Sequence, residues 1–112
     1  MAEIKPTEST VGNWTLFTWS SVTENDTFGV APLAGASGAA TLQVTGAFGG
    51  ATVIAQGSND NSNFVGLTDP GGTAVSLTAA GGAELRYPWP YMRPSASGGS
   101  SQSLAVVLAV LG

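Results

Sequence analysis

The sequence contains no cysteine and no histidine. Without cysteine there is no disulfide, no thiolate nucleophile and no thiolate metal ligand. Without histidine the chain lacks the side chain that most often serves as a general base and as a nitrogen ligand for transition metals. We therefore expect a protein that is not an enzyme and that needs no metal and no other cofactor.

Charged side chains are also scarce, with seven acidic and three basic residues and a net charge of −4. Phosphate-backbone binding requires clustered Lys and Arg, so we expect no binding to nucleic acid. No charged residue lies in 27–59 or in 94–112. A surface this poor in charge is typical of a neutral, Ser/Thr-rich β-protein, or of a protein whose surface is covered by partners.

Long apolar runs are missing as well. The apolar run from Leu104 to Leu111 is far shorter than the ~20 residues that a membrane helix needs. Residues 1–5 lack the basic region followed by an apolar region that marks a secretory signal. We expect synthesis in a cytoplasm and no association with a membrane.

Short segments of period two dominate what is present. In 40–45, Ala40, Leu42 and Val44 alternate with polar residues, which is typical of a half-buried strand. Gly, Pro, Asn and Asp separate such segments at 57–63 and 69–72. The expected strands are 14–19, 27–31, 40–45, 51–56, 64–67, 73–78, 84–94 and 102–111.

This spacing predicts an all-β fold, a single-domain antiparallel β-sandwich of jelly-roll or immunoglobulin-like type with about eight short strands. The sandwich is expected to occupy residues 14–112. Residues 1–13 are polar and show little periodicity, so we expect a flexible N-terminal arm.

The first expected strand has large apolar groups on both faces. Trp14 and Leu16 lie on one face, and Phe17 and Trp19 lie on the other. Because one face of a sandwich strand normally meets solvent, this pattern predicts that one face contacts a partner. Trp14, Phe17 and Trp19 are therefore candidate partner-binding residues.

The segment 84–94 combines aromatic residues with two of the three basic ones. Its prolines predict an edge strand or an extended loop. The rings have three possible roles: they cap the edge of the core, anchor a protein interface, or stack against sugars from one face. The candidate partner-binding residues of this segment are Arg86, Tyr87, Trp89, Tyr91 and Arg93.

The loop 57–63 contains Asp60 among Ser and Asn residues. It lacks the Gly at the sixth position and the Glu at the twelfth that an EF-hand loop requires. A hairpin turn is the favoured interpretation, and a weak calcium site that uses Asp60 is the alternative.

Several further runs resemble a family of small tailed-phage virion structural proteins of the capsid decoration or cement type. Those proteins carry a pattern like "vTGtFgGatv…QGSNDGtnW…LtDp…yvRP". Asn61 stands here where the family often has Gly, and Phe64 stands where it often has Trp. The matching runs are Gln43 to Val53, Gln56 to Asp60, Leu67 to Pro70 and Tyr91 to Pro94.

The resemblance implies a protein that binds the outside of an assembled capsid and stabilises it. Its partner would be the major capsid protein, and it would be a homo-oligomer, with a trimer favoured. It would be made in the host bacterial cytoplasm and located on the capsid surface of the virion. A carbohydrate-binding or tail-associated β-sandwich module remains the alternative, because the Ser58-Asn59-Asp60 turn is also similar to discoidin-like sandwiches.

Overall fold

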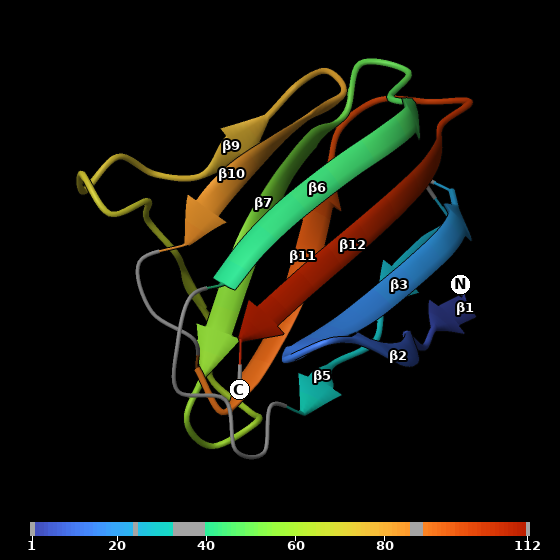
Figure 1. The fold of residues 1–112 in the computed structure, drawn as a ribbon. Coiled ribbons are helices and arrows are strands. Elements are labelled where there is room, and N and C mark those ends of the chain that lie inside the picture. The colour runs from blue at the N-terminus through green and yellow to red at the C-terminus, as the bar shows by residue number, and fades with distance from the viewer. Residues whose placement is uncertain (1, 24, 33–39, 86–88, 112) are drawn as a thin grey trace.

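The computed structural model describes residues 2–23, 25–32, 40–85 and 89–111, and it shows an all-β fold of packed antiparallel sheets (Figure 1). Among these residues no helix is long and apolar enough to cross a membrane. The strands are β1 Ala2–Ile4, β2 Thr7–Val11, β3 Trp14–Val22, β4 Asp26–Phe28, β5 Ala31–Pro32, β6 Ala40–Ala47, β7 Thr52–Ser58, β8 Val65–Gly66, β9 Ser76–Leu77, β10 Gly81–Leu85, β11 Tyr91–Ser97 and β12 Ser103–Leu111.

Two sheets face each other and form the predicted β-sandwich. The front sheet has the strand order β10-β6-β12-β3-β2. The back sheet has the order β5-β11-β7-β8, and β9 also pairs with β7. In Figure 1, β6, β12 and β3 lie in front of β7 and β11. The core fills the space between these layers.

The last strand, β12, is the centre of the front sheet. Its residue Leu108 lies opposite Phe17 of β3 on one side and Leu42 of β6 on the other. All three side chains are buried, so this row faces the core. From Leu104 to Leu111 of β12, buried and half-buried residues alternate without interruption. Residues 102–111 are apolar on both faces, which favours a central strand over an edge strand, and the structure confirms this position.

The core is anchored by Trp19, whose side chain is fully buried. Its indole Nε1 donates a hydrogen bond to the carbonyl oxygen of Gly29 at 3.0 Å. Its ring meets Phe28 edge to face, with the ring centroids 6.1 Å apart. An indole N–H is usually paired when it is buried, so this bond allows a large aromatic group inside the core.

A bulge extends β3 beyond its predicted end. Ser21 has a φ of 54°, and the register between β3 and β12 shifts at this point. The extra residue turns Val22 back toward the core, where it lies opposite Leu104 and is fully buried. The expected strand 14–19 ended before this bulge, at the polar residues Ser20 and Ser21.

Residues 1–13, expected to form a flexible arm, contribute β1 and β2. β1 pairs in parallel with β4, and β2 pairs with β3 at an edge of the front sheet. The chain passes from β1 to β2 at Pro6. The Gly29 N–H donates to the Ile4 carbonyl oxygen at 2.8 Å. A Cβ on Gly29 would come within 3.1 Å of Lys5 Cα, so glycine permits this close approach.

The expected strand 84–94 corresponds to two strands in different sheets. β10 is an edge of the front sheet, whereas β11 lies between β5 and β7 in the back sheet. The expectation of an edge strand is therefore confirmed for β10. It is wrong for Tyr91 and Met92 of β11, which pair with β5 on one side and with β7 on the other. β5 pairs only with Tyr91 and Met92. Pro94, which lacks an N–H, lies beyond that pairing.

Gly57 of β7 is in close contact with an aromatic ring. A Cβ built at Gly57 would lie 2.5 Å from Cγ of Trp89, whose side chain packs against the core. We expect Gly57→Ala to lower the free energy of unfolding by about 1–3 kcal/mol, because the ring must shift within a packed site. Urea unfolding followed by tryptophan fluorescence measures this change.

The matched control for this prediction is Gly66→Ala in the neighbouring strand β8. A Cβ at Gly66 meets nothing within 4 Å, so its effect should stay within about 0.5 kcal/mol. Equal destabilisation by the two substitutions would contradict a specific contact between Gly57 and Trp89.

Candidate functional site

Two of the predicted partner-binding residues, Phe17 and Trp19, belong to the core. They are 3% and 0% exposed. Their assignment as partner-binding residues is therefore wrong, because β3 turns this side of the strand toward the back sheet. Trp14 and Leu16 lie on the opposite side of β3 and are half-buried. The prediction that β3 carries apolar groups on both faces thus holds, with Trp14 on the outward one.

The strand register gathers further apolar side chains around Trp14. Val11 of β2 and Leu111 of β12 lie directly opposite it. Leu16 lies opposite Ala109 in the next outward row. We call the outward side of β2, β3, β12 and β6 the outer face. It consists of Thr7, Ser9, Val11, Trp14, Leu16, Thr18, Thr41, Gln43, Thr45, Ala105, Val107, Ala109 and Leu111.

None of the residues of the outer face is charged. Val107 lies near its centre, opposite Thr18 and Gln43. Val11, at the rim, is 61% exposed. Aromatic and aliphatic groups without charge are typical of the central part of a protein interface. Sequence periodicity alone did not predict this patch, since it depends on the pairing of β12 with β3.

The predicted aromatic segment divides between two sides of the back sheet. Trp89 contacts the inward side of Gly57, which lies opposite the buried Met92. Tyr91 lies opposite Ser58, one residue further along β7, and therefore points outward. Arg86 and Tyr87 lie outside the described residues. Trp89 and Tyr91 do not form a shared platform.

Arg93 is held in a fixed position on the outward side of the back sheet. Its guanidinium carbon lies 3.9 Å from the centroid of the Phe64 ring, a cation–π arrangement. Its Nε donates to Oε1 of Gln56 at 3.0 Å. We call Gln56, Phe64, Tyr91 and Arg93 the Arg93 cluster. These contacts orient the guanidinium before any partner arrives, which lowers the entropy cost of binding.

No acidic residue pairs with Arg93 among the residues that the structure describes. Asp26 and Arg93 both line a small cavity of about 150 Å³ between β4 and β11. The Asp26 carboxylate instead accepts hydrogen bonds from the backbone N–H and the hydroxyl of Thr23, which lower the pKa of Asp26. The terminal nitrogens of Arg93 are thus suited to a carboxylate supplied by another molecule.

Sequence reasoning identified Arg93 and Tyr91 but missed the roles of Gln56 and Phe64. Gln56 was assigned to a strand, and Phe64 was assigned to the start of the next one. The contact between Arg93 and Gln56 spans 37 positions and follows from their opposition across β11 and β7. No local pattern could have revealed it, because the register of these strands is a tertiary property.

The loop that follows β7 is closed by Asp60, as the turn interpretation predicts. Oδ1 of Asp60 accepts from the Ser58 hydroxyl and from the backbone N–H groups of Ser62 and Asn63. Oδ2 accepts from the Asn63 side chain. These bonds hold the pKa of Asp60 well below its ordinary value. The residues described include no group of three or more metal-ligating side chains.

The Asp60 turn predicts a pH dependence of stability. Because the folded-state pKa lies below the ordinary value of 3.8, the hydrogen-bonded carboxylate stabilises the fold above that pH. The stabilisation is lost as the pH falls toward the folded-state pKa. We expect Asp60→Ala to lower the free energy of unfolding by a constant amount from neutral pH to about pH 5, and by a decreasing amount below it.

Urea unfolding of both proteins over this range measures the difference. Asn59→Ala, an exposed change in the same turn, is the control and should show little effect. A difference between wild type and Asp60→Ala that grows in acid would contradict the stabilising role of the ionised carboxylate.

A double-mutant cycle tests the Arg93 cluster. Arg93→Ala, Phe64→Ala and the double variant should give a coupling free energy of about 0.5–1 kcal/mol, as expected for an exposed cation–π pair. The pair Arg93 and Thr52, on the same outward side, is the control cycle and should show no coupling. A coupling of zero for Arg93 and Phe64 would show that the ring does not position the guanidinium.

Comparisons with known proteins do not identify the chain. No family model matches the sequence. No curated protein matches it either. A solved structure of protein NMB1881 from Neisseria meningitidis aligns with a TM-score of 0.44 and 11% identity, covering 96% of this chain and 82% of that one. PirA aligns with a TM-score of 0.40 and 12% identity, covering 94% of this chain and 92% of that one.

Proposed function

We propose that this chain is a non-enzymatic structural protein of a tailed-phage virion, which binds the outside of the assembled capsid and stabilises it. It is made in the host bacterial cytoplasm and acts on the capsid surface. Its partner is the major capsid protein. The proposal is supported by the resemblance of residues 43–53, 56–60, 67–70 and 91–94 to decoration proteins, and by the outer face.

The single observation that carries the proposal is the uncharged outer face around Trp14 and Val107. It spans four neighbouring strands of a continuous sheet. Its backbone is held by sheet pairing, so binding would order few residues. The apolar part of this face is formed by neighbouring residues, Val11, Trp14, Leu16, Ala109 and Leu111. Contiguous apolar surface on a small domain usually marks a protein interaction site. A large and comparatively rigid partner surface, such as an assembled shell, suits a sheet of this kind.

Stabilisation then follows from mass action. A molecule that binds only the assembled lattice adds its binding free energy to the lattice and opposes disassembly. The Arg93 cluster lies on the back sheet, away from the outer face. It offers an anchor for an acidic group of a neighbouring molecule. Self-association, with a trimer favoured, is part of the proposal through the family resemblance.

The carbohydrate-binding alternative rested on the similarity of the Ser58-Asn59-Asp60 turn to discoidin-like sandwiches and on Tyr87, Trp89 and Tyr91 forming one stacking surface. Trp89 packs inward and Tyr91 points outward, and Tyr87 lies outside the described residues. No specific observation favours that alternative. A tail-associated module differs from a decoration protein in copy number, which a stained gel of purified particles measures. A decoration protein is abundant, and a tail module is present in few copies.

Attachment to capsids tests the outer face directly. We expect Val107→Lys to reduce co-sedimentation with particles lacking the protein by about tenfold or more, because a charge enters the centre of the interface. Ile54→Lys is the matched control. Ile54 is equally half-buried but lies on the outward side of the back sheet, so attachment should persist.

Thermal melts of both variants show whether they are folded. If a folded Val107→Lys protein attaches as well as the wild-type protein does, the outer face is not the docking surface. If only Ile54→Lys loses attachment, the docking surface lies on the back sheet. Absence of any attachment by the wild-type protein would overturn the proposed function itself.

A further inference from the structure

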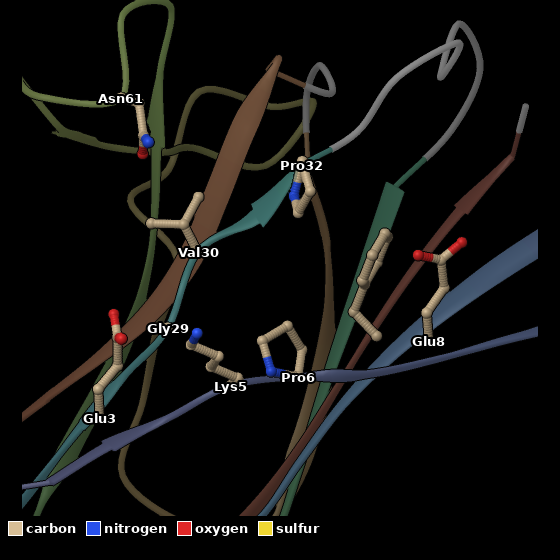
Figure 2. A pocket seen from close by; sticks show the side chains of 9 residues that line it. Glu3, Lys5, Pro6, Glu8, Gly29, Val30, Pro32 and Asn61 are labelled. Carbon is tan, nitrogen blue, oxygen red and sulfur yellow. The ribbon is translucent and has the colours of Figure 1, made fainter.

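A cavity of about 410 Å³ opens where the chain passes from β1 to β2. Figure 2 shows Glu3 and Glu8 on either side of the opening, with Lys5 and Pro6 between them. Phe17 of the core forms part of its wall. Glu8 lies opposite Phe17 in the β2–β3 pairing, so Glu8 projects on the inward side of the front sheet. We call this cavity the edge cleft.

The walls of the edge cleft combine apolar surface with charge. Phe17, Val30 and Pro32 supply apolar atoms, and Glu3 and Glu8 supply carboxylates at the rim. Within the described residues, no ion pair links Lys5 to either glutamate. An apolar wall with a negative rim complements a long aliphatic side chain that ends in a cation. Lysine and arginine have this shape, since their stems bury while their charged groups stay in water.

The strand that borders the edge cleft is also open for pairing. β2 is the last strand of the front sheet, and all five of its residues are exposed. Its second edge has no partner strand in the described part of the chain. An unpaired edge presents a row of N–H and C=O groups, and an extended peptide can add to it as a further strand.

A single added peptide strand would contact both the unpaired edge of β2 and the edge cleft. A peptide strand added beside β2 would direct alternate side chains to the two sides of the front sheet. Those on the inward side would lie beside Glu8 and reach the edge cleft. Those on the outward side would lie beside Ser9 and Val11 and extend the outer face. The partner therefore needs basic and apolar residues in alternation.

We propose that the β2 edge binds an extended segment of a partner protein, whose lysine or arginine side chains enter the edge cleft. Backbone hydrogen bonds hold the segment, and the contacts with Glu3 and Glu8 select its basic residues. The opposite edge of the front sheet, β10, also carries an exposed glutamate, Glu84. Glu84, however, lies opposite Thr41 on the outward side. The cavity of about 650 Å³ that it lines is formed by β6 and β10 of the front sheet alone and has no wall from the back sheet. This inference does not depend on the proposed function.

The probe is a short synthetic peptide in which lysine alternates with valine, titrated into the full-length, isotopically labelled protein and followed by amide chemical shifts. We expect saturable shifts of β2 amides. Glu8→Gln should weaken binding about two- to fivefold, as expected for an exposed ion pair. Lys5→Gln should tighten it, because a repelling charge is removed. Glu84→Gln is the matched control and should change nothing.

Two further peptides separate the backbone contribution from the charge contribution. Glutamine in place of lysine should weaken binding, and high salt should abolish the difference between the two peptides. Methylation of alternate backbone nitrogens should abolish binding, because the edge hydrogen bonds are lost. Shifts confined to β10, equal effects of Glu8→Gln and Glu84→Gln, or no saturable shift with the lysine peptide would each overturn the proposal.

Discussion

The pairing of β12 with β3 and β6 is the constraint on which the rest of the structure depends. Because side chains alternate along a strand, this register assigns every residue of the front sheet to the core or to the outside. Leu108 therefore joins Phe17 and Leu42 inside, while Val107 lies with Thr18 and Gln43 outside. A shift by one residue would expose the first row and bury the second. The register of β12 therefore determines both which residues fill the core and which residues form the outer face.

The N-terminal segment makes the sandwich asymmetric. β1 pairs with β4, and β2 pairs with β3, so the chain changes sheets at Pro6 and borders the edge cleft. At the opposite edge of the front sheet, formed by β10, the glutamate Glu84 lies on the outward side instead. One border of the sandwich therefore offers an open strand beside a charged cleft. The polar composition of 1–13, which suggested disorder, suits an edge strand whose residues are exposed on both sides.

The described residues contain twelve strands where about eight were predicted, and the difference has identifiable causes. Two strands come from the segment expected to be an arm. The expected strand 27–31 is divided into β4 and β5, and 84–94 into β10 and β11. Most of 73–78 is irregular, although it alternates, and only Ser76–Leu77 pairs as β9. Propensity indicates where a strand is possible, but a partner strand decides whether it forms.

The sequence by itself determined the fold class, the central strand and the turns, because each depends on neighbouring residues. Alternation predicted β6, and β-branched residues after a Gly/Ser turn predicted β12. Asp69 to Gly72 predicted a turn, in which the Gly72 N–H donates to the Asp69 carbonyl oxygen at 2.9 Å. Only the tertiary structure decided that Trp19 is buried and Trp14 faces outward, or that Arg93 meets Gln56. Both faces of β3 are apolar, and Arg93 and Gln56 are 37 positions apart, so these outcomes depend on which strands pair and in which register.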